Sequence, residues 1–274
     1  MSLAPVDFEY LRTLVKNHTA IVLDDGKEYL AETRLAPLVN EHGCGSLQEL
    51  VGLLRREAFS GLHRKVLDAM TNNETWFFRD AHPFAALTGV VIPELQKRRN
   101  ARREIAIWSA ACSSGQEPYS IAMALRENFN LGDWRFPILG TDFSTAVLQR
   151  AKYGLYRQME VNRGLPAKLL TRYFVQQGLH WQLKPEILNM VSFRFLNLAE
   201  PWGNIIPPAD IVFLRNVLIY FDVETRKAIL ARVRRVLAPD GLLFLGCAET
   251  TLNLDSEFER IQQGNYVCYK IKER

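Results

Sequence analysis

The residues best suited to chemistry lie around Cys112, where an apolar run gives way to small side chains. The run from Ile105 to Trp108 is typical of a buried parallel strand. Five small residues surround Cys112: Ala110, Ala111, Ser113, Ser114 and Gly115. Small side chains at the carboxyl end of a strand let a ligand approach the backbone, and open α/β sheets bind ligands there. The stretch predicts a nucleotide-like cofactor site, although an ordinary strand-loop-helix joint has the same pattern.

A carboxylate ends the next apolar segment, residues 136–142. An acid at the end of the second strand of a nucleotide-binding fold can accept hydrogen bonds from both ribose hydroxyls, and Asp142 has this position. The same carboxylate could instead cap the helix that follows, a role that Ser144 could share. Both interpretations remain open from the sequence.

The order of apolar segments predicts the elements that position these residues. Strands and helices alternate from Ile105 onward, which indicates βαβ units and a parallel sheet. Further strands are expected at 190–196, 210–214, 242–246 and 265–271, with a turn at 238–241. We expect a helical domain at 1–70, a linker and connecting helix at 71–100, and an α/β domain at 101–274. A small antiparallel insertion is expected at about 170–190.

The linker is unusual because its polar residues at 71–75 precede three aromatic residues, Trp76, Phe77 and Phe78. Linkers normally avoid large apolar groups, so this one is expected to fold back onto another part of the protein. Asp80 is expected to cap the helix that follows.

Composition restricts the class of protein. The 274 residues include 34 Lys and Arg against 30 Asp and Glu, a net charge of +4. Four cysteines lack a Cys-x-x-Cys pair, which argues against zinc and disulfides, so no metal is expected and a reducing cytoplasm fits best. The amino terminus does not resemble a signal peptide, and no apolar run approaches the roughly 20 residues of a membrane span. A cytoplasmic monomer without membrane insertion is expected.

Five ordered motifs resemble one family. They are 71–80, 108–120 (near the pattern W-S-A-x-x-S-T-G-E-E-P-Y-S), Gly140-Thr141-Asp142, 215–222, and 237–246 followed by Ala248-Glu249. The chain resembles the CheR family, S-adenosylmethionine-dependent methyltransferases that esterify glutamates on bacterial chemotaxis receptors. The resemblance implies an α/β fold: an all-α N-terminal domain, then a Rossmann-like methyltransferase domain with a small inserted antiparallel β subdomain.

The resemblance also implies a site, a cofactor and a partner. S-adenosyl-L-methionine would be the cofactor and S-adenosyl-L-homocysteine the product, and the cytoplasmic helices of a methyl-accepting receptor would be the substrate. Arg79 and Tyr220 would act at the reacting groups. The cofactor pocket would contain Asn73, Thr75, Arg79, Glu117, Asp142, Asn197, Leu198, Arg215 and Asn216.

Three departures from the family pattern bear on function. Ala111, Ser114 and Gln116 replace residues of similar size in the first motif, so cofactor binding is expected to survive. The second helix is arginine-rich in some members of the family, but here it keeps only Arg34, so its role as a docking surface is in question. The basic segment 55–65 is then either an alternative docking surface for an acidic helical partner or a solvated face. The turn at 176–179 is short, and we therefore expect no dependence on a receptor C-terminal peptide tether.

Three other functions are considered. A nucleic-acid methyltransferase would fit the isoelectric point of about 8.9 and the basic segment 97–103. However, the segment after Leu214 lacks the Asn/Asp-Pro-Pro-aromatic motif, and cytosine chemistry needs a cysteine nucleophile such as Cys112 or Cys247. A non-catalytic signalling adaptor is disfavoured because Arg79, Asp142 and Tyr220 are all present. A Rossmann oxidoreductase is least favoured because Gly-x-Gly-x-x-Gly is absent.

Overall fold

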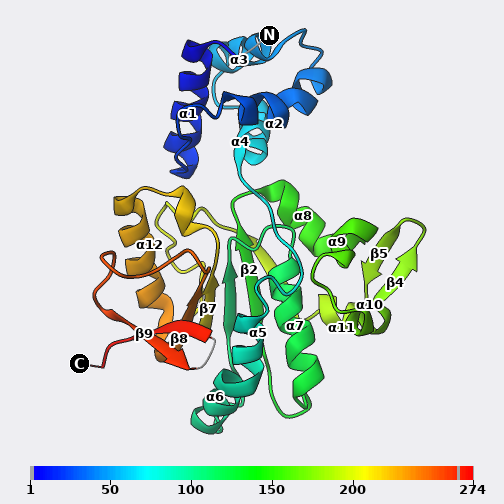
Figure 1. Ribbon diagram of the computed structural model, residues 1–274, viewed down its shortest axis with the longest axis vertical. Coiled ribbons are helices and arrows are strands. Elements are labelled where there is room, and N and C mark those ends of the chain that lie inside the picture. Colours follow the sequence, from blue (N-terminus) through cyan, green and yellow to red (C-terminus); the bar gives the residue numbers. More distant parts are fainter. Residues whose placement is uncertain (1–2, 264–265, 274) are drawn as a thin grey trace. The chain divides into compact units, whose positions relative to one another are not determined.

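The computed structural model describes residues 3–263 and 266–273, which form two compact units (Figure 1). One unit contains the residues up to 72 together with 220–225, and the other contains 73–219 and 226–274.

The first unit is helical. Its helices are α1 (Pro5–Thr19), α2 (Glu28–Glu41), α3 (Leu47–Arg56) and α4 (Gly61–Met70). Apolar residues three or four positions apart give each helix one buried face, such as Leu11 and Val15 on α1. The segment after residue 219 joins this unit, because Ile21 and Phe221 form an antiparallel bridge and the Val22 N–H donates to the Tyr220 carbonyl over 2.9 Å.

The second unit is built on a seven-stranded sheet with the order β6-β2-β1-β7-β8-β10-β9. The first five strands in this order are parallel, and β10 and β9 are antiparallel. The bounds are β1 (Ile107–Ala110), β2 (Ile138–Asp142), β6 (Val191–Phe195), β7 (Ala209–Leu214), β8 (Leu237–Leu245), β9 (Phe258–Gln263) and β10 (Tyr266–Ile271).

Two strand predictions were incomplete. The expected turn at 238–241 lies within β8, because this strand begins at Leu237 and pairs there with Ala209 across an irregularity in register. The sequence pattern also did not predict β9, which pairs with β10 along its full length. The last strand was expected from 265, and Asn265 lies outside the described residues.

Helices cover both faces of this sheet (Figure 1). The helical segments after residue 80 are α5 (His82–Ala86), a π-helical turn (Leu87–Val91), α6 (Ile92–Arg98), α7 (Gln116–Asn128), α8 (Thr145–Tyr153), α9 (Gln158–Asn162), α10 (Ala167–Tyr173), α11 (Pro185–Leu188), a 3-10 turn (Leu218–Tyr220) that ends in the helical unit, and α12 (Val223–Val236). Of these, α9 and α10 contact the small inserted sheet. One core joins α5, α6 and α7 to strand residues such as Ile107 and Phe213. Trp108, next to Ile107, packs edge-on against Trp202 instead, as alternation along a strand requires.

The insertion is a separate three-stranded antiparallel sheet with the order β3-β5-β4. Its strands are β3 (Leu155–Arg157), β4 (Phe174–Gln177) and β5 (His180–Leu183), so this sheet begins before residue 170. Gly178 and Leu179 alone connect β4 to β5, and the φ angle of +58° at Gly178 suits glycine in so tight a turn.

In the part of the chain that the structure describes, no helix has the length and apolar character needed to cross a membrane.

Candidate functional site

Most of the candidate cofactor residues lie at the carboxyl ends of four neighbouring strands. Asp142 ends β2, Asn197 follows β6, and Arg215 follows β7. Glu117 is in the first turn of α7, after the loop that leaves β1. Because β6, β2, β1 and β7 are adjacent and parallel, the fold gathers these residues along one edge of the sheet.

The Asp142 carboxylate is buried and anchors two loops. It accepts hydrogen bonds from the Ser113 N–H at 2.8 Å and the Ser144 N–H at 2.9 Å. Ser144 caps α8 by accepting from the Val147 N–H. Of the two roles left open by the sequence, helix capping therefore belongs to Ser144. An ionised carboxylate has about four acceptor positions, so these two backbone bonds do not exclude a role of Asp142 in ligand binding.

The loop after β1 has an unusual backbone. Ala111, Ser113 and Gly115 have φ angles of +54°, +50° and +92°. Non-glycine residues in this region are strained, and such strain gathers at functional sites. A Cβ at Gly115 would lie 3.0 Å from the Ala151 Cβ and 3.1 Å from the Tyr119 ring, so this position has no room for a side chain. Gly115 is therefore required for close packing against α7 and α8, and the strained backbone marks this loop as a candidate functional site.

A buried cation connects three parts of the site. Arg215 donates to Glu117 at 2.8 Å, to Asp80 at 2.6 Å and to the carbonyl of Arg79 at 2.9 Å. The Arg215 side chain is only 1% exposed, whereas those of Glu117 and Asp80 are 12% and 26% exposed. One buried cation thus faces two carboxylates, and the cluster carries an excess negative charge. The predicted helix cap at Asp80 was wrong: Ala81 precedes α5, and Asp80 bonds Arg215 instead.

The linker packs onto the α/β unit, as its aromatic residues predicted. Phe77 is fully buried and meets Tyr156 and Phe174 edge-on. The Ser113 hydroxyl donates to the Asn73 carbonyl at 2.8 Å, and the Phe78 N–H donates to the Ser120 hydroxyl at 2.9 Å. These bonds place Asn73, Thr75 and Arg79 on one short segment fixed to the loop after β1.

Arg79 is held by an aromatic ring shared with another cation. Its guanidinium carbon lies 4.2 Å from the centre of the Trp76 ring, and that of Arg163 lies 4.0 Å from the same ring. Arg163 also pairs with Glu74 at 2.8 Å, and Arg79 donates to the Glu74 carbonyl at 3.1 Å. The buried Nε of Arg79 has no hydrogen-bond partner among the described residues. An acceptor from a ligand would satisfy it.

Glycine is required beside this ring. A Cβ at Gly164, which has a φ of +84°, would lie 2.1 Å from the Phe77 carbonyl oxygen and 2.9 Å from the Trp76 ring. The segment that carries Arg163 therefore touches the linker backbone directly. Sequence reasoning assigned no role to Trp76 as a ring platform or to Arg163, because the two residues lie far apart in the chain.

Glu249 fixes the loop after β7. Its carboxylate accepts hydrogen bonds from the backbone N–H groups of Asn216, Val217, Leu218 and Gly246, at 2.7 to 2.8 Å. Asn216 has a φ of +59°, so the turn itself is strained. The motif that contains Glu249 was noted in the sequence, but its partners follow a different strand and only the fold brings them together.

Three other candidate residues have partners of their own. The Asn197 side chain donates to Glu200 at 3.0 Å and accepts from the Ala199 N–H, and the buried Leu198 has a carbonyl that accepts from Arg232 at 2.9 Å. Tyr220 belongs to the helical unit, where its hydroxyl accepts a hydrogen bond from the Asn72 amide. The roles expected for them, and for Thr75, stay predictions.

Both basic segments are largely engaged in internal contacts. Arg55 pairs with Asp7 at 3.0 Å, Lys65 pairs with Glu41, and His63 is buried with a ring nitrogen 3.0 Å from the Leu54 carbonyl. Arg34 of α2 donates to the Met70 carbonyl at 2.7 Å.

In the segment 97–103, Arg99 and Arg102 bond the buried Asp210, and Arg99 also bonds Asp240. This segment therefore closes the end of the sheet opposite the site, since Asp210 is at the start of β7.

The buried Cys112 is a poor nucleophile. Burial, followed by the negative charges of Asp142 and Glu117, raises the pKa of this thiol well above its ordinary value. Since the thiolate is the reactive species, Cys112 stays protonated and acts as a small apolar side chain.

Comparison with known proteins matches both parts of the chain. The family model "CheR methyltransferase, all-alpha domain" matches residues 6–71, and "CheR methyltransferase, SAM binding domain" matches residues 73–267. Chemotaxis protein methyltransferase 1 of Pseudomonas aeruginosa is 43% identical over 99% of this chain and 100% of its own length. Chemotaxis protein methyltransferase Cher2 of Pseudomonas putida is 41% identical with the same coverage, and the Salmonella typhimurium protein is 35% identical over 99% of this chain and 93% of its own.

Proposed function

The chain belongs to the CheR methyltransferase family, and we propose that it forms glutamyl methyl esters on the cytoplasmic helices of a bacterial chemoreceptor. It is a methyltransferase of chemotaxis with S-adenosyl-L-methionine as cofactor, which follows from the two family matches and the full-length relatives. The proposal concerns the acceptor and the roles of individual residues.

The residues present fit this cofactor in two respects. S-adenosylmethionine carries a sulfonium, an ammonium and a carboxylate, and is therefore a net cation. The Arg215, Asp80 and Glu117 cluster has one positive and two negative charges, which complements a cation. The Arg79 Nε–H, buried without a partner in the described chain, can donate to a carboxylate. The excess negative charge of the buried Arg215 cluster, which complements a cationic ligand, is the single observation that best supports the proposal.

Each residue then has a physical task. Asp142 would accept hydrogen bonds from the ribose hydroxyls. Its carboxylate also accepts from the backbone N–H groups of Ser113 and Ser144, and these bonds hold the two loops in place. Glu117 would accept from the ammonium, oriented by Arg215 and by the Ser109 hydroxyl at 2.7 Å. Asn73, Thr75, Asn197, Leu198 and Asn216 would line the remaining surface of the pocket.

No general base is required at the acceptor. The bound sulfonium supplies an activated methyl group, and a glutamate carboxylate with an ordinary pKa near ~4.3 is already ionised at neutral pH. The protein must hold the acceptor oxygen in line at roughly 3–3.5 Å from the methyl carbon and exclude water. Arg79 would orient a carboxylate, and Tyr220 would lie beside the transferred methyl.

The basic segments favour protein over nucleic acid as the acceptor. Arg99 and Arg102 are engaged with Asp210 and Asp240, so part of the charge of segment 97–103 is used within the protein and is not free for a phosphate backbone. Receptor docking through 55–65 is limited in the same way, because Arg55 and Lys65 are paired with Asp7 and Glu41. We propose that the receptor, if it docks on this segment, contacts those of its residues that lack such pairs. We also propose that the protein is a cytoplasmic monomer.

The test is incubation of the purified protein with methyl-labelled S-adenosylmethionine and bacterial membranes that contain chemoreceptors. We expect label on a receptor-sized band, and we expect mild alkali to release it as methanol, because esters hydrolyse and methylated amines do not. Alkali-stable label would contradict the ester. Independence from a tether is tested by calorimetry with a receptor C-terminal peptide, where binding in the micromolar range would refute it.

A further inference from the structure

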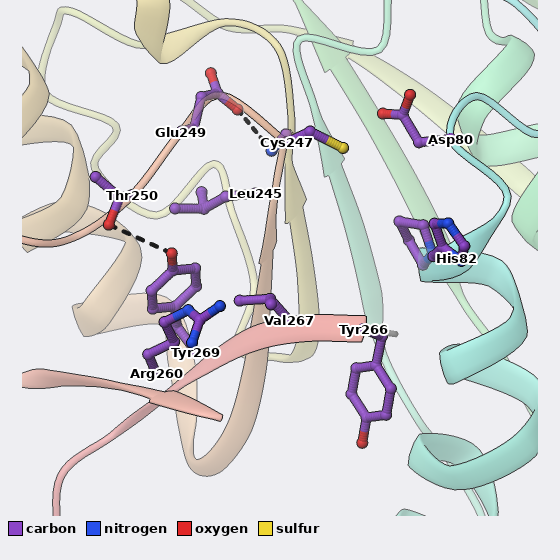
Figure 2. Close-up of a pocket in the computed structure, with 12 residues that line it drawn as sticks. Asp80, His82, Leu245, Cys247, Glu249, Thr250, Arg260, Tyr266, Val267 and Tyr269 are labelled. Carbon is purple, nitrogen blue, oxygen red and sulfur yellow. Dashed lines mark hydrogen bonds between the residues drawn. The ribbon is translucent and has the colours of Figure 1, made fainter. Parts of the chain in front are cut away.

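A second cavity lies at the end of β8, beside the residues just described. It has a volume of about 360 Å³, within the range of ligand pockets. Asp80 and His82 lie on one side of it, and the end of β8 with β9 and β10 forms the other (Figure 2). Asp80 and Glu249 both line the cavity, and they also make the contacts that fix Arg215 and Asn216.

The acidic groups of the cavity are already bonded within the protein. Asp80 accepts from Arg215 at 2.6 Å, and Glu249 accepts from four backbone N–H groups. In contrast, the side chains of His82 and Arg260 have no hydrogen-bond or ion-pair partner among the described residues. Val267 lies between them, and Leu245 lies on the same side of the cavity as Arg260 (Figure 2). The Arg260 guanidinium beside these apolar side chains is complementary to a carboxylate on an aliphatic stem.

The position of the cavity relates it to the methyl acceptor. The candidate cofactor residues follow β6, β2, β1 and β7, and β8 is the next strand along the sheet. Asp142 on β2 is assigned to the ribose, whereas Glu117 and Arg215, nearer to β7, are assigned to the methionine end that carries the methyl group. An acceptor that reaches this methyl would therefore have its flanking residues near the end of β8.

We propose that this cavity binds a second acidic side chain of the methyl-accepting protein, next to the glutamate that is methylated. Arg260 donates to its carboxylate, and its methylene groups pack on Leu245 and Val267. This inference rests on the proposed function for the identity of the acceptor, and it adds a specificity subsite that involves no covalent step.

Kinetics with receptor membranes test the subsite. Arg260→Gln is expected to raise the KM for receptor about fivefold and to weaken its salt dependence, because a recognition charge acts mainly on encounter and affinity. Turnover at saturating receptor and the Kd for S-adenosylmethionine should change by less than about twofold, and Arg260→Lys should restore much of the loss. Arg235→Gln removes an equally exposed charge on α12, outside the cavity, and serves as the matched control. Equal KM values for Arg260→Gln and Arg235→Gln would overturn the proposal.

A second measurement needs no receptor and separates this inference from the proposed function. Cys247 lines the cavity and is exposed, whereas Cys112 and Cys268 are buried. The rates at which Cys247 reacts with an anionic and with a cationic methanethiosulfonate are compared by peptide mapping. Their ratio cancels the reactivity of the thiol itself.

We expect Arg260→Gln to lower the anionic-to-cationic ratio about threefold relative to the wild type, and Arg235→Gln to leave it unchanged. A lowered ratio in a protein that labels no receptor would mean that the proposed acceptor is wrong while the cavity still selects anions. A ratio that Arg260→Gln does not alter would refute the subsite.

Discussion

The Nη1 of Arg215 lies 2.8 Å from the Glu117 carboxylate, although 98 positions separate the two residues in the chain. The contact joins the end of β7 to the first turn of α7, and the same guanidinium reaches Asp80 in the linker. Because the Arg215 side chain is almost completely buried, its charge must be balanced by these partners.

Replacement of Asp142 should weaken cofactor binding. Asp142→Ala would remove the proposed ribose contact, but it would also leave the N–H groups of Ser113 and Ser144 without their acceptor. Asp142→Asn keeps one acceptor oxygen and is the better variant. Loss of a charge-assisted bond is worth about 1.5–3 kcal/mol, so we expect the Kd for S-adenosylmethionine to rise roughly 10- to 100-fold by calorimetry. Unchanged affinity in both variants would show that the ribose assignment is wrong.

Arg79→Ala should reduce methyl transfer far more than stability. The Arg79 side chain stacks on Trp76 and has an unpartnered buried Nε, so its loss breaks few structural contacts. We expect activity to fall about 100-fold because a reacting group is misplaced, with a cost in unfolding free energy near 1 kcal/mol. Parallel measurement of labelled product and thermal unfolding checks this. Equal losses in both would indicate a purely structural role.

Arg163→Gln should lower activity, although Arg163 itself does not contact the reacting groups. Arg163 stacks on the face of Trp76 and bonds Glu74, and Arg79 also contacts both residues. We therefore expect about a tenfold loss in kcat, partial rescue by Arg163→Lys, and no change in thermal stability beyond that of the control. Arg150→Gln, which breaks the Arg150–Glu160 pair elsewhere, is the matched control. If the two glutamine variants have the same kcat, Arg163 does not position Arg79.

Glu249→Gln should destabilise the turn after β7. An amide has one acceptor oxygen and an NH2 group that cannot accept, so it cannot satisfy four backbone donors. The expected cost is about 2–3 kcal/mol, together with weaker binding of S-adenosylmethionine because Arg215 and Asn216 lose their support. Thermal unfolding and calorimetry measure the two effects. A variant with wild-type melting and affinity would contradict this role.

The Arg99–Asp240 pair should make the free energy of unfolding depend on pH in the acidic range. The hydrogen bond from Arg99 lowers the pKa of Asp240 below its ordinary 3.8 in the folded state. The unfolded chain then binds the proton more tightly, so the stabilisation is present above pH 3.8 and is lost as the pH falls through the lowered folded value.

Asp240→Asn should remove this acid-dependent part of the curve. Because Asp240 is 36% exposed, we expect an effect of at most about 1 kcal/mol, seen in thermal unfolding between pH 3 and 7. Asp133→Asn, which loses only a more exposed pair with Arg103, is the control. Identical curves for the two variants would show that the Arg99–Asp240 pair contributes nothing.

Local pattern was enough to predict much of the sheet. The strands around Ile107, Ile138 and Ile211 are buried on both faces, so each appears as an apolar run whose end is marked by small or polar residues. The burial of the linker aromatics was also predicted, because a large apolar side chain such as Phe77 is unfavourable in a solvated segment. In contrast, β9 is half-exposed and was missed, and the 238–241 turn pattern was overridden by pairing with β7.

The amino-acid sequence by itself determined the βαβ order, the family motifs and the candidacy of Asp142, because each of these depends on residue type and near neighbours. The resemblance of those motifs to the CheR family made Glu117, Arg79 and Arg215 candidates. Tertiary structure alone decided their partners: Ser144 rather than Asp142 as the helix cap, Arg215 as the partner of Asp80, and Glu249 as the acceptor for two separate turns. The physical reason is that a buried charge bonds whichever polar group the fold brings within about 3 Å. The number of residues between two groups in the chain does not predict their distance in the fold.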